Sequence, residues 1–294
     1  MNFPINTFRQ LRPYDKLTLG YLLIVLLLLA LSPNRPAAAG RIAVVHVAAI
    51  LLILLITKFA DRSRVLQVVH DLYPMALFMA LFSEFTHLTT VLFPHWMEPL
   101  LIKFDGWMFG GSPQHWTITH FSPVTLEFLA FAYWSYYLII PATLFLVYHK
   151  NYPHELIATT TRMCLTMYAC YVLFILLPAR GPQDVLPANG ALMSKNGLFT
   201  NMVRTIQSYG SVHGAAFPSS HVAVAWAMFF ALQRLYPKIA LFAALLITAL
   251  TLSVITMGYH FSLDAIGGVV LAIGVNSAWR QKEDRTKLET QMNH

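Results

Sequence analysis

The chain has 294 residues, of which 57% are hydrophobic and only 11% are charged, and its formal net charge is +7. This composition excludes an ordinary water-soluble domain and is typical of an integral membrane protein. Nucleic acid is a poor explanation for the positive charge, because no basic domain lies outside the apolar runs.

Eight apolar runs approach the length of about 20 residues that a helix needs to cross a bilayer. They cover residues 17–33, 41–58, 72–93, 122–148, 161–177, 219–235, 238–257 and 261–279. We therefore predict an all-α, polytopic membrane helical bundle with about eight transmembrane helices. The fourth run is long enough to cross at a tilt.

The distribution of Lys and Arg orients this bundle. With the amino end in the cytoplasm, fourteen of the twenty Lys and Arg residues fall in inner segments, as the positive-inside tendency requires. Both ends of the chain are therefore predicted to be cytoplasmic. The excess charge either sets this topology alone or also contacts anionic lipid headgroups.

Three acidic or basic side chains interrupt the third and fourth runs. Glu84 and His87 are three residues apart and share a helix face, which suits either a metal ligand pair or a buried polar contact between helices. Glu127 lies near the outer end of the fourth run, where it could cap a helix, pair with an arginine or touch a substrate.

Two short motifs near the carboxyl end place ionisable groups where apolar runs begin. The motifs are Pro218-Ser219-Ser220-His221, and Gly258-Tyr259-His260 followed by Asp264. Ionisable groups at a membrane border are costly and mark functional sites. The sixth run is expected to start outside and the seventh to return there, which brings His260 to the level of His221.

A forty-residue outer segment, from Pro178 to Phe217, joins the fifth and sixth runs. Long loops inside a compact bundle are often functional. Because Arg180 follows the fifth span directly, we expect it to converge with His221 and His260 at the outer face.

This set of residues suits phosphoryl transfer through a phosphohistidine. His260 and Asp264 are four residues apart on one helix face, so the carboxylate can hold one ring nitrogen and leave the other free to attack. His221 can protonate the departing alkoxide.

The phosphoryl oxygens need positive and hydrogen-bonding partners in this scheme. Arg180, Ser219, Ser220 and the amides that begin the sixth helix could supply them. The alternative is structural for each residue: His221 caps a helix, His260 sits among interfacial aromatic rings, and the serines form an ordinary helix start.

At these residues the chain resembles the type 2 phosphatidic acid phosphatase superfamily of membrane lipid phosphatases and phosphotransferases, over roughly residues 72–279. The resemblance implies phosphate binding by Ser219 and Ser220, a general acid at His221, a nucleophile at His260 and an orienting carboxylate at Asp264. It covers the last six spans, which would form a six-helix catalytic core.

Three further segments resemble the branch that contains inositol phosphorylceramide synthases and their bacterial relatives. They are Phe104 to Gly110, Pro178 to Pro182 and Ala216 to His221. The chain departs from the general pattern at Val254, where the phosphatases of the superfamily carry an arginine, and it lacks the lysine of the first motif. Arg180 is the best match to a phosphate-binding cation, and Lys195, Arg204 or His213 could add to it.

The sequence thus predicts a metal-independent lipid phosphate phosphatase that needs no cofactor and acts in the membrane on a phosphorylated lipid. Its domains would be an amino-terminal transmembrane hairpin at 1–71, the catalytic core at 72–279 and a cytoplasmic tail at 280–294. The resemblance implies a bacterial inner membrane, and the predicted topology puts the active site on the extracytoplasmic side.

Two alternatives remain open. A phosphotransferase would use the same first half-reaction and pass the phosphoryl group or a phosphorylated headgroup to an alcohol acceptor such as inositol, a sugar or another lipid. A transporter or lipid-binding protein would use the polar residues as a path, and Glu84 and His87 are the residues that favour it.

Overall fold

A computed structural model describes residues 11–150, 153–186, 197–210 and 212–292, and the side chains among these except at 118 and 283–292. The long helices are α2 (Pro13–Leu31), α3 (Ala39–Phe59), α4 (Arg64–Phe82), α8 (Pro123–Trp134), α9 (Tyr136–His149), α10 (Pro153–Leu176), α13 (Ser220–Leu235), α14 (Pro237–Thr256) and α15 (Ser262–Met292). The shorter ones are η1 (Ala60–Arg62), α5 (Phe85–Leu88), α6 (Glu98–Phe109), α7 (Pro113–His120), α11 (Pro182–Val185) and α12 (Leu198–Gly210). Within the described residues there is no strand, and the predicted all-α class is confirmed.

Six helices in the described part of the chain are long and apolar enough to cross a membrane: α2, α3 with η1, α4, α10, α14 and α15 as far as Lys282. The pair α8 and α9 makes a seventh span if it is taken as one bent element. The remaining predicted run lies on α13, which has 16 residues. At 1.5 Å per residue this helix is only about 24 Å long.

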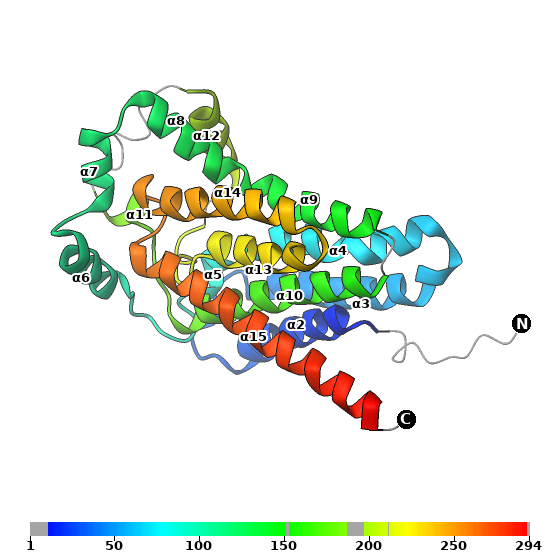
Figure 1. Ribbon diagram of the computed structural model, residues 1–294. Helices are drawn as coiled ribbons and strands as arrows, with labels where there is room; N and C mark the ends of the chain where they lie inside the picture. The colour runs from blue at the N-terminus through cyan, green and yellow to red at the C-terminus, as the bar shows by residue number, and fades with distance from the viewer. Residues whose placement is uncertain (1–10, 151–152, 187–196, 211, 293–294) are drawn as a thin grey trace, which may run out of the picture.

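Helix α13 lies inside the bundle rather than at its surface. It packs against α9, α10, α14 and α15, and Figure 1 shows it among these helices. Its alanines are buried and small: Ala223, Ala225, Ala227 and Ala231 are at most 3% exposed. Small residues let neighbouring helices approach closely.

Helix α15 approaches the start of α13 closely at Gly268. A Cβ atom added to Gly268 would come within 2.6 Å of the Ser219 carbonyl oxygen, so only glycine fits there. This contact brings the beginnings of two helices together, and each beginning carries one of the two sequence motifs.

Two predicted spans have different shapes in the structure. The third begins eight residues earlier than expected, at Arg64, because Ser63 caps the helix by accepting a hydrogen bond from the Leu66 N–H. It ends at Phe82 rather than at residue 93, and the short helix α5 follows. The predicted boundary after residue 71 therefore falls inside α4.

The fourth span does not cross as one straight, tilted helix. It bends by 43° between α8 and α9. Ser135 lies at the bend and donates from its hydroxyl to the Ala132 carbonyl at 2.6 Å. Serine bonding back to the preceding turn is a known cause of helix bending.

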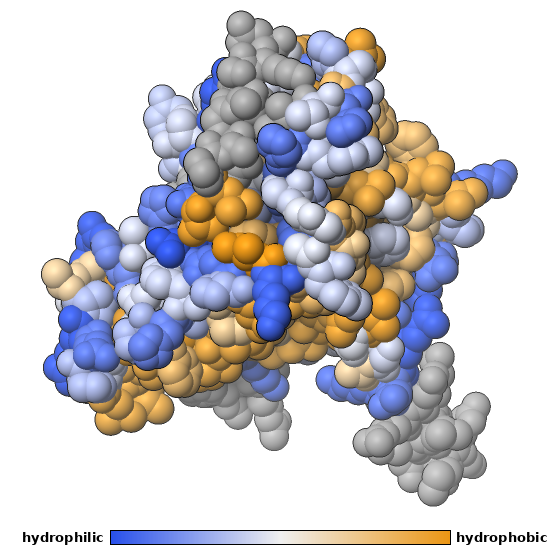
Figure 2. Space-filling view, turned by 90° about the vertical axis from the view of Figure 1, so that its left-hand side faces the viewer, coloured by the Kyte–Doolittle hydropathy of each residue, from blue (hydrophilic) through white to orange (hydrophobic). Residues whose placement is uncertain are grey.

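Four of the shorter helices gather at one end of the bundle. In Figure 1, α6, α7, α11 and α12 lie at the left, whereas α2 begins and α15 ends at the right. Figure 2 views the left-hand end: its surface is largely hydrophilic around a small hydrophobic patch, and hydrophobic residues show along the lower edge and at the upper right. The two helix ends nearest the chain termini therefore lie away from the end where the polar short elements meet.

Candidate active site

His221 lies in the first turn of α13, directly after the two serines. Ser219 is the N-cap of this helix: its hydroxyl accepts a hydrogen bond from the Val222 N–H at 3.4 Å. The Ser219 N–H donates to the Asp264 carbonyl at 2.9 Å. Ser219 is fully buried and Ser220 is 5% exposed. The helix-start role of Ser219 is thus present in the structure, and the open N-terminal amides of α13 lie beside it.

His260 lies in the turn between α14 and α15. Gly258 has a φ of 80°, a left-handed conformation that glycine adopts readily, and the His260 N–H then donates to the Val254 carbonyl at 2.8 Å. His260 Nδ1 is 3.5 Å from Asp264 Oδ2. The same Oδ2 accepts the Phe261 N–H at 2.9 Å, so Asp264 also fixes the backbone of the turn.

The two imidazole rings meet between the starts of α13 and α15. The ring centroids of His221 and His260 are 6.0 Å apart, and the ring planes make an angle of 59°. This separation would let a tetrahedral phosphoryl group contact both rings.

Burial lowers the pKa of His260 from its usual 6.5 to about 4, and the backbone of Ala216 beside its ring partly offsets this effect. His260 is therefore neutral at physiological pH. A neutral imidazole has the lone pair that a nucleophile requires.

This lowered pKa predicts a pH dependence of stability. The unfolded chain binds a proton at this histidine near pH 6.5 but the folded protein only near pH 4, so unfolding takes up a proton between these values. The stabilisation is complete above about pH 6.5 and is lost as the pH falls toward 4, by on the order of 3 kcal/mol. Thermal unfolding in detergent should show a shallower loss over this window for His260→Asn than for the unmodified protein. An equal loss of stability with falling pH in the two proteins would contradict the lowered pKa of His260.

A group of tyrosines that the sequence reasoning missed surrounds His221. Tyr133 Oη is 3.3 Å from His221 Nε2. The rings of Tyr133 and Tyr136 lie 5.3 and 4.4 Å from the His221 ring, and Tyr259 lies 4.4 Å from Tyr133. The available signal was the aromatic cluster from Tyr133 to Tyr137 within the fourth run. These rings pack against the His221 ring and fix its orientation.

Backbone contacts tie the Arg180 loop to the segments that carry the two histidines. The Ala216 N–H donates to the Ala179 carbonyl at 3.0 Å, and the Gln183 N–H donates to the Gly258 carbonyl at 3.1 Å. A Cβ atom on Gly181 would lie 2.5 Å from the Tyr259 carbonyl oxygen, so the loop touches the His260 turn. The structure therefore brings the Arg180 loop beside both histidine segments, as the sequence predicts.

The guanidinium of Arg180 already has a carboxylate partner. Its Nε and its backbone N–H both donate to Glu98 Oε1, at 2.6 and 2.9 Å, and the guanidinium lies over the Trp96 ring at 4.8 Å. The Arg180 side chain is 37% exposed, whereas that of Glu98 is 5% exposed. Glu98 orients the arginine and reduces its net charge, and the sequence reasoning did not identify it.

Asp105 anchors α6 to the start of α15. Its Oδ1 accepts the Ser262 N–H at 3.1 Å and also accepts the Ser262 hydroxyl. Burial raises the pKa of Asp105, and the two bonds from Ser262 oppose that shift. Asp105 lies in the segment from Phe104 to Gly110 that the sequence analysis singled out, and the contact gives this segment a positioning role.

Replacing Asp105 with alanine should leave the buried Ser262 N–H without its partner. We expect the free energy of unfolding to fall by about 1–3 kcal/mol, and activity to fall by on the order of 10-fold or more as the His260 turn loosens. Asp105→Asn keeps an acceptor oxygen and should recover most of both losses. Unfolding experiments and steady-state kinetics of both variants test this. An equal loss of stability and activity in the two variants would show that the charge of Asp105, rather than its hydrogen bonds to Ser262, matters.

Of the other predicted cations, Arg204 lies within electrostatic reach of Tyr259, the residue before His260. The Arg204 guanidinium donates to Asn201 Oδ1 at 3.0 Å, and His213 Nδ1 is 3.2 Å from Asp184 Oδ1. Val254 is fully buried, so an apolar side chain stands at the position of the superfamily's arginine. Lys195 lies outside the described residues.

Of the roles considered for Glu127, the structure shows a cap. Its carboxylate accepts the N–H groups of Phe199 and Thr200 and, at 2.8 Å, the Thr200 hydroxyl. These residues begin α12, which therefore docks on α8. Glu127 fixes the outer segment rather than the histidine pair.

Comparison with known proteins agrees with the geometry. Neither the curated proteins nor the solved structures compared with the chain gave a match. A family model described as the PAP2 superfamily matches residues 100–278, more than half of the chain and the part that contains both histidines. The chain therefore belongs to the PAP2 superfamily, an enzyme superfamily of phosphatases and phosphotransferases.

Proposed function

We propose that this integral membrane protein is a metal-independent lipid phosphate phosphatase that acts through a phosphohistidine. The observation that carries the proposal is the pair of imidazole rings 6.0 Å apart, one of which faces a carboxylate at 3.5 Å. One lies in the first turn of α13 and the other in the turn between α14 and α15, and both lie among the residues that match the superfamily.

In the first step, the ring nitrogen of His260 that faces away from Asp264 attacks phosphorus. A nitrogen–phosphorus bond forms as the bond from phosphorus to the lipid oxygen breaks, and that oxygen takes a proton from His221. Asp264 supports the positive charge that develops on the His260 ring. The products of this step are the lipid alcohol and the phosphorylated enzyme.

In the second step, water attacks the phosphohistidine. His221, now neutral, takes a proton from the water, and the nitrogen–phosphorus bond breaks to release phosphate and restore His260. Arg180, the hydroxyls of Ser219 and Ser220 and the first amides of α13 would stabilise the phosphoryl oxygens in both steps.

The test measures phosphate release by the purified protein, with a chelator present, from phosphatidic acid and from polyprenyl diphosphate. Release that proceeds with the chelator and disappears in His260→Ala supports the proposal. A requirement for a divalent ion, or activity that survives His260→Ala, overturns it.

A second candidate is the transferase of the inositol phosphorylceramide synthase-like branch. It is favoured by two features of the described residues: Arg180 is already paired with Glu98, and position 254, where the phosphatases of the superfamily carry an arginine, is valine. A phosphodiester carries one negative charge at phosphorus and needs fewer cations than a phosphomonoester or diphosphate. An acceptor alcohol would then replace water in the second step.

Product analysis separates the two candidates. The protein is incubated with labelled lipid phosphates or phosphodiesters and with inositol, a sugar or a lipid alcohol at saturating concentration. A labelled acceptor supports transfer, whereas free phosphate as the sole labelled product counts against it.

We also propose that the site faces the extracytoplasmic side of a bacterial inner membrane, with both termini in the cytoplasm. The excess of Lys and Arg in the predicted inner segments supports this orientation. Reporter fusions at the two termini test it, and a periplasmic signal from either end would contradict it.

A further inference from the structure

Helix α6 covers part of the active-site end of the bundle and presents apolar side chains outward. Pro99 lies in its first turn, and Gly110, with a φ of 70°, ends it. The residues that point inward are Glu98, Leu101 and Asp105, which are at most 3% exposed. This arrangement is the reverse of that on a water-soluble protein, where the acidic residues of a surface helix face the solvent.

The outer face of α6 is apolar and aromatic. Five large hydrophobic side chains of this 12-residue helix are between 41% and 78% exposed: Leu100, Ile102, Trp107, Met108 and Phe109. Leu100, Lys103 and Trp107 follow one another at spacings of three and four, so they share the side farthest from the buried residues. Apolar surface gathered in this way marks a contact with another molecule or with a membrane.

Two contacts fix the level of α6 relative to the membrane spans. Near its start, the Met97 N–H donates to the carbonyl of Pro178, which follows the end of α10 at Leu176, at 2.9 Å. Eight residues further along, Asp105 accepts the N–H of Ser262, the first residue of α15. Because both contacts lie at the ends of membrane spans, α6 runs across these ends, close to parallel to the membrane surface.

The length of α15 places Ser262 at a membrane border. Its membrane span runs from Ser262 to Lys282, 21 residues, which at 1.5 Å per residue is about 30 Å, the thickness of a hydrocarbon core. Ile266, Val270 and Ile273 on this span are between 40% and 62% exposed. Helix α6 packs beside the start of α15 (Figure 1), so the apolar face of α6 adjoins a surface that lies in lipid.

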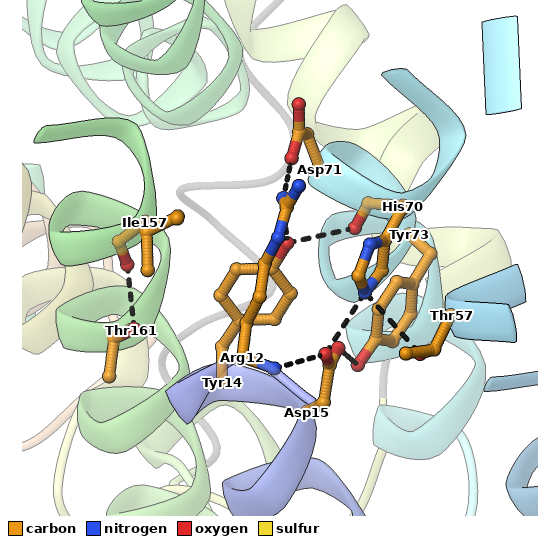
Figure 3. Close-up of polar contacts among 9 residues, drawn as sticks. All are labelled: Arg12, Tyr14, Asp15, Thr57, His70, Asp71, Tyr73, Ile157 and Thr161. Carbon is orange, nitrogen blue, oxygen red and sulfur yellow. Dashed lines mark hydrogen bonds and ion pairs between the residues drawn. The ribbon is translucent and has the colours of Figure 1, made fainter. Parts of the chain in front are cut away.

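The start of α2, at the opposite end of the bundle, is built differently. There Arg12 forms an ion pair with Asp71, and His70 Nε2 lies 2.9 Å from Asp15 Oδ2, as Figure 3 shows. The Tyr73 hydroxyl also donates to Asp15, at 2.8 Å. These polar groups join α2 to α4 through contacts with one another, whereas the acids of α6 hold the catalytic segments and leave an apolar face outside.

We propose that α6 lies in the headgroup region of the lipid leaflet at the active-site end, and that this contact with lipid holds the active site in its working geometry. An amphipathic helix of this kind lies in the membrane plane, with its apolar face at the boundary between headgroups and acyl chains. Trp107 then lies at the depth that indole rings prefer, and the exposed Lys103 extends to the lipid phosphates. The partner is the bilayer rather than a second protein, because the face adjoins the surface of a membrane span.

The inner face of α6 transmits this contact to the catalytic residues. Glu98 accepts hydrogen bonds from the Nε and the backbone N–H of Arg180. Asp105 accepts the N–H and the hydroxyl of Ser262, which follows His260 by two residues. If α6 leaves the lipid, both acids move, and Arg180 and the His260 turn lose the partners that orient them. This consequence rests on the proposed function, whereas the lipid contact itself does not.

Fluorescence quenching by lipid tests the contact. The purified full-length protein is placed in bilayers of phosphatidylcholine that is brominated either near the carbonyl group or near the methyl end of its acyl chain. The emission of Trp107 is the difference between the unmodified protein and Trp107→Phe. We expect bromine near the carbonyl group to remove most of this emission, and bromine near the methyl end or iodide in the water to remove little of it.

Three results of the quenching experiment overturn the proposal. Quenching by iodide but not by brominated lipid shows that α6 faces water. Stronger quenching from the methyl end places Trp107 in the acyl core rather than among the headgroups. Emission that no quencher reaches shows that protein covers this face, either a second copy of the chain or another partner.

Phosphate release from phosphatidic acid in unbrominated phosphatidylcholine bilayers tests the link to the active site. Trp107→Glu places a charge on the apolar face and should lower the rate by about tenfold or more, because small displacements of catalytic groups are costly. Leu100→Glu, on the same side of α6, should have a similar effect and decides the question if Trp107→Glu does not fold. Trp107→Phe keeps an aromatic ring and should retain the activity.

Two controls make the loss specific to α6. Trp116 is 53% exposed on α7, where its ring contacts His120 and Phe121, so Trp116→Glu should retain activity. Tyr73→Phe removes a hydroxyl from the group in Figure 3 and should lower the unfolding temperature without lowering activity.

Full activity in both glutamate variants of α6, or an equal loss in Trp116→Glu, overturns the link between lipid contact and the active site. If the unmodified protein releases no phosphate from any lipid phosphate, the proposed function fails, and the quenching of Trp107 still decides whether α6 lies in the lipid.

Discussion

Replacing His260 with alanine is expected to lower phosphate release from a lipid phosphate by about 10⁴-fold or more. Removal of a nucleophile that works with a second histidine and a carboxylate leaves only the contribution of substrate binding and electrostatic stabilisation. His260 is placed for this role by the Gly258 turn, by its backbone bond to Val254 and by Asp264 at 3.5 Å. The measurement is steady-state release of phosphate, together with trapping of the phosphorylated enzyme from labelled substrate.

Two further variants make this result specific. Asp264→Asn keeps an acceptor for the Phe261 N–H but removes the charge beside His260, so we expect a smaller loss, on the order of 10²- to 10⁴-fold, with KM little changed. His213→Ala removes an exposed histidine that pairs with Asp184, and should retain activity. Labelled enzyme that accumulates in His260→Ala would assign the nucleophile to another residue.

The meeting of the two histidines could be predicted because it depends on topology alone. Both motifs lie at the starts of helices, and two consecutive antiparallel spans return the chain to the same end of the bundle. The number of spans between the motifs therefore puts both histidines at the same side of the membrane. The all-α fold was also predictable. In lipid, a helix satisfies the hydrogen bonds of its own backbone, so long apolar runs predict membrane-spanning helices.

The groups that orient the site could not be predicted in this way. Glu98 and Asp105 lie in α6, which is not a span, and they act on Arg180 and Ser262, which are 82 and 157 residues away in the chain. The resemblance of Phe104 to Gly110 drew attention to the segment of Asp105 but not to its contact. Such contacts depend on how a short helix folds over the end of the bundle. Sequence spacing carries no signal for them.

The amino-terminal helices show a similar limit of sequence reasoning. Glu84 and His87 share a helix face when the third run is read as one helix, but that helix ends at Phe82. The break turns Glu84 toward His46 and leaves His87 to Arg41. A shift of the helix boundary thus changed the partners, although the same residues attracted attention in both descriptions.

Replacing His221 with glutamine is expected to lower activity on lipid phosphates by about 10²- to 10⁴-fold, the usual contribution of a general acid. Glutamine fills a similar volume but cannot deliver a proton to the departing alkoxide. The His221 ring lies against Tyr133 and Tyr136 and 6.0 Å from His260, which suits it to protonate an oxygen bound to the same phosphorus.

The dependence on leaving group distinguishes this role from a structural one. A phenolate such as p-nitrophenolate departs without a proton, so His221→Gln should act on p-nitrophenyl phosphate almost as well as the unmodified protein in the first step. His260→Ala should remain inactive on both substrates, because it lacks the nucleophile. If His221→Gln instead loses the same factor on both substrates, His221 positions the phosphate or the helix start. The proton must then come from another group. The Tyr133 hydroxyl, 3.3 Å from His221 Nε2, is a candidate for that donor.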